Sequence, residues 1–204
     1  DFLKMMARQE MPPKATHLAE VAEEIGNQVA RASQTIQRLG EMGRAPDFDR
    51  QPICIDRPIA DTLAMVENQF MLENICLDVH IDPDLPPIMG HHGRLVQVVY
   101  NILDNAREAV VRQRERFEGS GPHTITIGAV ASAQAVVITI ADTGPGIPEH
   151  VRDRIFEPFF TTKNDGRGKG LGLAIVHEIV RDFNGRILVA SRSGGGATIT
   201  LSFP

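Results

Sequence analysis

The segment from residue 91 to residue 117 constrains the fold more than any other part of this chain, because it carries both faces of one long helix. Its apolar residues recur three and four positions apart, as in a helix that packs on a core. They are Leu95, Val98, Val99, Ile102, Leu103, Ala106 and Val110. Gln97, Asn101, Asn105 and Glu108 recur at four, four and three positions, so they share the opposite face. The sequence therefore predicts a helix that packs on one side and presents asparagines on the other.

The segments around this helix alternate between strands and helices. A helix over residues 59–73 and a strand over 75–81 precede it, and strands over 124–127 and 135–140 form a hairpin after it. A helix over 171–183 follows, and a last hairpin is formed by 187–190 and 197–203. Helices mixed with two hairpins indicate an α+β fold, a two-layer sandwich in which a helix layer covers a mixed sheet.

The first part of the chain has a different pattern. Apolar residues alternate at spacings of four and three through Leu18, Ala22, Ile25, Val29, Ala32, Ile36 and Leu39. A single amphipathic helix on a monomer shows such spacing, but its strictness favours a helical bundle that dimerises. We expect a helical segment over residues 1–45, a linker rich in Gly, Pro and Asp over 46–58, and a domain over 59–204.

Composition excludes several classes of function. The net charge of −5, without a basic stripe interleaved with aromatics, argues against a nucleic-acid surface. No apolar run approaches the roughly 18 residues of a membrane span, and no signal peptide is evident, so we expect no direct membrane contact. Cys54 and Cys76 lie in no metal or redox spacing. We expect them to be buried or half-buried thiols of a reducing compartment, the cytoplasm.

The paired asparagines are the first candidate for chemistry. Asparagine is a mediocre helix former that supplies a neutral oxygen ligand and an amide donor. Mg²⁺ requires oxygen ligands and keeps waters beside substrate phosphates. A solvated polar face would also explain Asn101 and Asn105, but two asparagines one turn apart favour a metal site.

Two glycine-containing motifs follow. Asp142 precedes Gly144 and Gly146 at a strand end, where a carboxylate either makes a turn or accepts a hydrogen bond from an exocyclic amine such as that of adenine. Glycines at 168, 170 and 172 open a helix whose N–H groups form an anion site. The spacing is not that of a P-loop.

Between these motifs lies the segment from Phe156 to Lys163. Its phenylalanines are expected to anchor a loop, and Lys163 is placed to meet a phosphate. The polar, glycine-rich stretch from 164 to 169 is expected to be a lid over a nucleotide. Together the motifs predict a pocket for ATP and its metal.

These motifs resemble the N, first glycine, F and second glycine boxes of two-component sensor histidine kinases, and residues 196–199 resemble the final glycine box. The resemblance covers roughly residues 50–204. It implies the Bergerat ATP-binding fold of the GHKL superfamily. The helix with the heptad pattern resembles the second helix of the dimerisation and phosphotransfer hairpin.

The resemblance implies roles for individual residues. Asn105 would bind Mg²⁺, and Asn101 would position the ion or the phosphates. Asp142 would accept a hydrogen bond from the adenine amine, assisted through water by Thr198. Lys163 joins the two asparagines in the expected catalytic set. The expected ATP-binding set is Asn101, Asn105, Asp142, Gly144, Gly146, Ile147, Phe160, Thr161, Thr162, Lys163, Gly168, Lys169, Gly170, Leu171, Gly172 and Thr198.

The chain departs from the family pattern near its second asparagine. Many members have a basic residue and an aromatic where this chain has Glu108 and Ala109, a form that resembles the nitrogen- and oxygen-sensing subgroup. Neutralisation of phosphate charge would then depend more on Lys163, Arg167 and Lys169.

None of the seven histidines has the sequence context of the family's phosphoacceptor. His17 precedes an apolar residue, and the others lie at 80, 91, 92, 123, 150 and 177. The chain begins without an initiator methionine, so we expect the acceptor upstream and no autophosphorylation by this fragment alone. The implied partners are a second copy, through the helical hairpin, and a response regulator whose aspartate receives the phosphoryl group. The alternatives are a GHKL-type ATPase, which would have a glutamate at the position of Asn101, and an ATP-binding module without kinase activity.

Overall fold

The computed structural model describes residues 50–116, 123–162, 170–191 and 195–204. The described helices are α3 (Asp56–Leu72), α4 (His92–Arg116) and α5 (Gly172–Asp182), with a 3-10 helix η1 (Glu149–Arg154). The described strands are β1 (Gln51–Ile53), β2 (Cys76–Ile81), β3 (Ile88–Gly90), β4 (Thr124–Ala131), β5 (Val136–Asp142), β6 (Arg186–Ser191) and β7 (Ala197–Phe203). The predicted helical segment over 1–45 lies outside the described residues.

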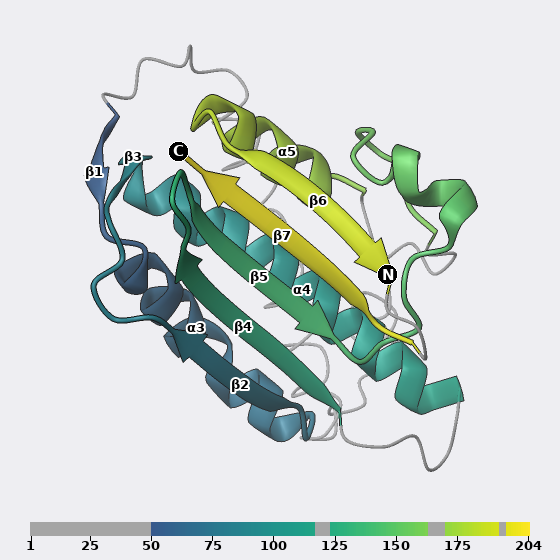
Figure 1. Cartoon of the computed structure of the whole chain (residues 1–204). Coiled ribbons are helices and arrows are strands. Elements are labelled where there is room, and N and C mark those ends of the chain that lie inside the picture. The colour runs from purple at the N-terminus through teal and green to yellow at the C-terminus, as the bar shows by residue number, and fades with distance from the viewer. Residues whose placement is uncertain (1–49, 117–122, 163–169, 192–194) are drawn as a thin grey trace, which may run out of the picture. The chain divides into compact units, whose positions relative to one another are not determined.

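Five strands form the main sheet in the order β2-β4-β5-β7-β6. β2 runs parallel to β4, whereas the β4–β5, β5–β7 and β6–β7 pairs are antiparallel. The sheet is therefore mixed, and α3, α4 and α5 cover one of its faces (Figure 1). The prediction of a two-layer α+β fold is confirmed.

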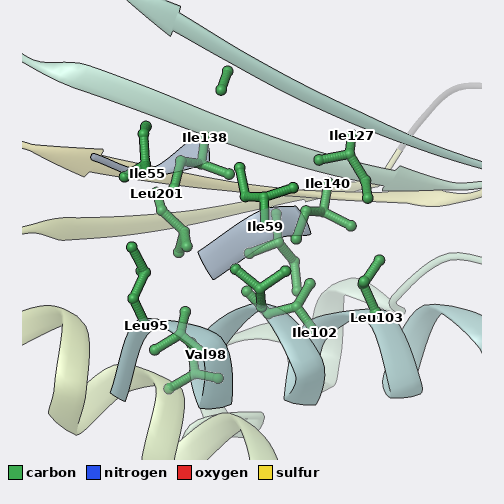
Figure 2. Packing of buried hydrophobic residues seen from close by; sticks show 14 of the residues in the cluster. Ile55, Ile59, Leu95, Val98, Ile102, Leu103, Ile127, Ile138, Ile140 and Leu201 are labelled. Carbon is green, nitrogen blue, oxygen red and sulfur yellow. The ribbon is translucent and has the colours of Figure 1, made fainter. Parts of the chain in front are cut away.

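The core lies between the sheet and α4. Alternate residues of β5 and β7 are buried, as expected for strands with one face on a helix layer. All the residues of the predicted core face of α4 are buried. In Figure 2, Ile102 and Leu103 of α4 point toward Ile127 and Ile140 of the sheet. The side of α4 that its apolar spacing predicted to be buried is thus the side that faces the sheet.

The segment before the main sheet differs from prediction. β1 pairs antiparallel with β3, and Ile53 and Ile55 are buried, although a linker was predicted there. α3 begins at Asp56 rather than at residue 59, because Pro58 is accommodated in the first helical turn, where its missing N–H has no helical partner. Residues 51–58 therefore pack with the domain.

Cys54 and Cys76 are free thiols but both are exposed, so the prediction of buried or half-buried thiols was wrong. Within the described ranges, no helix combines the length and the apolar character that a bilayer span requires.

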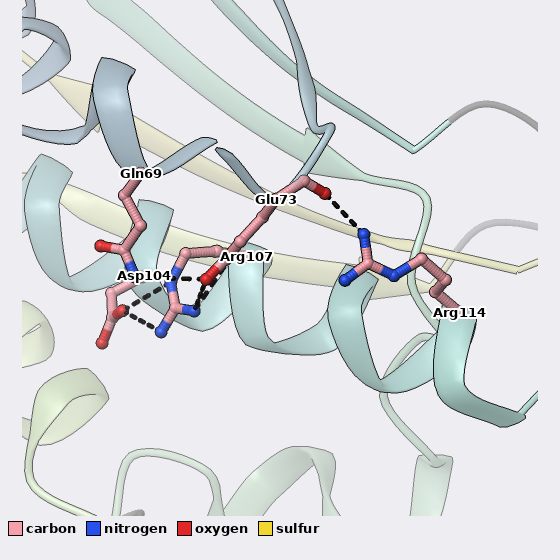
Figure 3. Close-up of polar contacts among 5 residues, drawn as sticks. All are labelled: Gln69, Glu73, Asp104, Arg107 and Arg114. Atoms are coloured by element: carbon pink, nitrogen blue, oxygen red, sulfur yellow. Dashed lines mark hydrogen bonds and ion pairs between the residues drawn. The ribbon is translucent and has the colours of Figure 1, made fainter. Parts of the chain in front are cut away.

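A polar cluster joins α4 to the end of α3 (Figure 3). The guanidinium of Arg107 donates from Nη1 to Oε1 and Oε2 of Glu73, at 2.9 and 3.2 Å, and from Nε and Nη2 to Oδ1 of Asp104. Arg114 donates to the backbone oxygen of Glu73 at 2.6 Å. Burial alone lowers the pKa of Arg107, but Asp104 and Glu73 outweigh burial and raise the pKa above its ordinary value. Arg107 therefore stays charged and fixes α4 against α3.

We expect Arg107→Ala to lower the free energy of unfolding by about 1–3 kcal/mol, because the half-buried Glu73 carboxylate loses the charged Nη1 that bonds both of its oxygens. Arg107→Lys keeps the charge but loses the planar guanidinium, so its free energy of unfolding should lie between those of the parent chain and Arg107→Ala. The exposed Arg181→Ala is the matched control and should change stability by less than about 0.5 kcal/mol. The chain has no tryptophan, so urea unfolding is followed by circular dichroism. Equal midpoints for Arg107→Ala and Arg181→Ala would contradict the assignment.

Candidate functional site

The two asparagines of α4 lie at the beginning of α5. Asn101 is only 5% exposed, and among the described residues its Nδ2 has no hydrogen-bond partner. A Cβ on Gly172, the first residue of α5, would lie 3.6 Å from Nδ2 of Asn105 and 3.7 Å from Oδ1 of Asn101. The N-terminus of a helix carries unpaired N–H groups and partial positive charge. The buried amide of Asn101, which has an unused donor, therefore lies beside the N-terminus of α5. Such a helix end suits an anion.

An ion pair holds α5 in this place. Nη2 of Arg94, in the first turns of α4, lies 2.9 Å from Oδ2 of Asp182 at the end of α5. Both side chains are largely buried, and the guanidinium of Arg94 also lies over the ring of Phe183. The packing of α5 on α4 thus fixes Gly172 beside the asparagines.

Asp142 ends β5 on the face of the sheet that is covered by helices. Its Oδ1 accepts hydrogen bonds from N–H of Gly144 at 2.8 Å and from N–H of Ala197 at 3.3 Å. The first bond is the turn chemistry that its sequence context suggested, whereas the second comes from β7. Two backbone donors on one oxygen fix the orientation of a carboxylate that is 8% exposed.

The structure does not bring Thr198 to Asp142. In β7 the residues with buried side chains are Ala197, Ile199, Leu201 and Phe203, so Thr198 lies on the other face of the sheet. Its register partner in β5 is Ala141, whereas Asp142 is contacted by Ala197. The expected assistance of Asp142 by Thr198 therefore has no support in the geometry, and Ala197 takes its place.

The loop after Asp142 packs backbone against backbone. Gly196, with φ of +93°, lies so close to the carbonyl oxygen of Asp142 that a Cβ would overlap it. Gly146 has φ of +77°, and a Cβ on it would lie 3.0 Å from the carbonyl oxygen of Gly196. Ser191 bonds both backbone groups of Ile147. The ends of β5, β6 and β7 thus form one compact wall beside Asp142.

Gly144 connects this wall to α4. A Cβ on Gly144 would lie 2.8 Å from Cβ of Ala109, one turn beyond Asn105. The site therefore extends from the beginning of α5, along the polar face of α4, to the loop after β5.

The segment after η1 is hydrogen-bonded to Gly170, two residues before the first residue of α5. Phe159 donates its N–H to the carbonyl oxygen of Gly170 at 2.8 Å, and Phe160 lies under the guanidinium of Arg154, 4.5 Å from the ring centroid. Leu171 packs against the hydrophobic core. Thr161 and Thr162 are exposed. The predicted site residues Lys163, Gly168 and Lys169, and Arg167 with them, lie outside the described residues.

Three contacts of this site were not predicted: those of Ala109, Ser191 and Ala197. Alternation back from Ile199 along β7 would have placed Ala197 on the inner face. The partner of Ser191 is 44 positions away in sequence, and no local pattern indicates such a contact.

Residues 90–204 match the family model described as "Histidine kinase-, DNA gyrase B-, and HSP90-like ATPase". The chain is 32% identical over 196 residues to sensor histidine kinase ZraS of Escherichia coli (strain K12). That alignment covers 96% of this chain and 40% of ZraS, so the chain spans less than half of this relative.

Two solved structures are similar. The catalytic domain of histidine kinase ThkA has a TM-score of 0.65 and 26% identity, and the match covers 77% of this chain and 96% of that one. Full-length ShkA in complex with AMPPNP has a TM-score of 0.74 and 25% identity, over 96% of this chain and 40% of ShkA.

Proposed function

Because the chain belongs to the family of histidine kinase-, DNA gyrase B- and HSP90-like ATPases, we propose that it is the catalytic region of a sensor histidine kinase, which transfers the γ-phosphate of ATP to a histidine. One observation carries the proposal: within the described part of the chain, the buried side-chain amide of Asn101 has an unpartnered Nδ2, and its Oδ1 lies beside Gly172 at the N-terminus of α5. An amide donor and a helix N-terminus suit the phosphates of a nucleotide.

The position of Asn101 also bears on the type of reaction. Hydrolysis needs a base that takes a proton from water, and an asparagine amide has no basic group. Transfer to a histidine needs no such base at this position, because the attacking imidazole nitrogen has its own lone pair. The residue therefore favours phosphotransfer over hydrolysis.

Each end of the nucleotide has a place in this site. The carboxylate of Asp142 would accept a hydrogen bond from the adenine amine, and the loop through Gly144 and Ile147 would pack against the base. Asn101 would donate to a phosphate oxygen. Lys163, Gly168 and Lys169 would contribute on the phosphate side, as their motifs suggest.

Mg²⁺ is the metal that suits these residues. The amide oxygens of Asn105 and Asn101 are neutral, hard ligands, and such sites leave room for waters and phosphates. Asn105 would hold the ion. Bound Mg²⁺ would neutralise charge on the phosphates.

The rest of the reaction involves parts beyond the described residues. The acceptor histidine would attack the γ-phosphorus in line, and a neighbouring acidic residue would take its proton. We place this histidine on the first helix of the hairpin, upstream of the described residues. The segment over 1–45 would form a homodimer, and a response regulator would take the phosphoryl group in the cytoplasm. Glu108 and Ala109 are the residues that support membership of the nitrogen- and oxygen-sensing subgroup.

The test is an incubation with γ-labelled ATP. This chain alone should incorporate no label, and should label a separately supplied helix that bears the upstream acceptor. The label should be acid-labile, as expected for phosphohistidine. Release of free phosphate without labelled protein would identify a hydrolase instead. Label on this chain that disappears in His17→Gln would show that the acceptor is His17.

A further inference from the structure

Ser191, the last residue of β6, binds both backbone groups of one residue in the loop after β5. Its Oγ accepts a hydrogen bond from N–H of Ile147 at 3.0 Å and donates one to the carbonyl oxygen of Ile147 at 2.7 Å. A single hydroxyl therefore bonds Ile147 as a neighbouring strand would. In Figure 1 the end of β6 lies beside the loop that follows β5.

The loop has few other ways to be held. Of the residues Pro145, Gly146, Ile147 and Pro148, the two prolines have no N–H to donate. Only Gly146 and Ile147 can donate from the backbone, and Ser191 uses the second of these donors. Gly146 itself has φ of +77°. Because glycine adopts positive and negative φ about equally readily, its own preference does not hold the loop in this conformation. Loss of the hydroxyl therefore removes the hydrogen bond made by the N–H of the peptide between Gly146 and Ile147.

The same end of the β6–β7 hairpin also holds Asp142. Ser191 is the register partner of Ala197, and Ala197 donates its N–H to the Asp142 carboxylate. One pair of residues thus fixes both the carboxylate and the loop after it. These two features would face the base in the proposed ATP site.

We propose that Ser191 is a positioning residue for the adenine base, which acts by holding the peptide between Gly146 and Ile147. The inference rests on the proposed ATP site. Ser191 is exposed, so its bonds add little to global stability, and its effect is local order in the loop. The expected signature is therefore weaker binding of any ligand that contains the base, with no change for the phosphates alone.

The test compares Ser191→Ala with the parent chain. Loss of the hydroxyl should weaken ATP and ADP binding about three- to tenfold, the range for a net hydrogen bond or two. Binding of inorganic tripolyphosphate should not change. In the full-length kinase, KM for ATP should rise by the same factor while kcat at saturating ATP stays constant. Ser191→Thr, which keeps the hydroxyl, should restore the parent values.

A second measurement needs no nucleotide. The amide of Ile147 should exchange with solvent faster in Ser191→Ala than in the parent chain, and should recover in Ser191→Thr. Ser132→Ala is the matched control, because Oγ of Ser132 donates to the carbonyl oxygen of Ala135 at 3.0 Å in the turn at the other end of β5. It should change neither exchange at Ile147 nor nucleotide binding.

Each other outcome overturns one statement. If the parent chain binds no ATP, the proposed function fails, whatever the exchange at Ile147. If the parent binds ATP and Ser191→Ala binds it equally, the positioning role alone is wrong. Equal losses for ATP and tripolyphosphate would also contradict it, because Ser191 would then act on the phosphates.

Discussion

Replacement of Asn105 by alanine is expected to lower the rate of phosphotransfer by the full-length kinase at least about hundredfold, equivalent to about 2.7 kcal/mol of transition-state stabilisation. The reason is the shortage of other ligands at this point of the site. Within the described ranges no group of three or more His, Cys, Asp or Glu side chains is placed to hold a metal ion. The side-chain amide of Asn105 lies beside Gly172, with Nδ2 as its nearest atom, so its oxygen would be the ligand offered where the phosphates are proposed to meet α5.

Binding measurements separate this role from a loss of folding. Mg²⁺ should tighten ATP binding to the parent chain and should have little effect on Asn105→Ala. Asn105→Asp, which keeps an oxygen ligand, should retain part of the Mg²⁺ effect. Asn68→Ala is the matched control, since Asn68 is an exposed asparagine within α3. Phosphotransfer by Asn105→Ala at the parent rate would show that the metal is held by other residues.

The sequence was most informative where one period extended over many residues. α4 has 25 residues, and its apolar spacing identified the buried face correctly. Once that face is fixed, the geometry of a helix places Asn101 and Asn105 on a common side. The depth of Asn101 was not predictable, because it depends on the packing of α5 against α4, to which the core residues of α5 and the ion pair of Arg94 with Asp182 both contribute.

Short elements and single contacts were not predicted. β1 and β3 have three residues each, too few to show an alternation, and Pro58 suggested a break where the structure has a first helical turn. The hydroxyl of Ser191 contacts the loop after β5, and the N–H of Ala197 contacts the end of β5 itself. Such contacts follow from strand order, and strand order does not appear in any local pattern.

Thr198 shows how a motif match can be displaced by one residue. The resemblance suggested Thr198 for the base, but a shift of one position in a strand moves a side chain to the other face. The buried residues Ile199, Leu201 and Phe203 already define the inner face of β7. Their alternation points to Ala197, which contributes through its backbone rather than its side chain.

Selectivity for ATP over GTP is expected to be about tenfold to hundredfold, and to depend on Asp142. Its carboxylate can only accept hydrogen bonds, so it would pair with the amine of adenine and repel the carbonyl oxygen that guanine has at that position. Asp142→Asn provides a sharper test than removal of the side chain. The N–H groups of Gly144 and Ala197 both point at Oδ1, so the amide oxygen of the variant must occupy that position. Its NH₂ group then replaces Oδ2 and becomes a donor.

This exchange of acceptor for donor should change the preference between the nucleotides. Asp142→Asn should lose about tenfold to hundredfold in affinity for ATP, because two donors then face each other, and should bind GTP more tightly than the parent chain does. Asp153→Asn, an exposed aspartate of η1, makes the same chemical change and should alter neither affinity. Titrations of both nucleotides against the three proteins give the ratios directly. Equal affinity of the parent chain for ATP and GTP would mean that Asp142 does not contact the base, and that its two backbone bonds serve only to fix the turn after β5 against the start of β7.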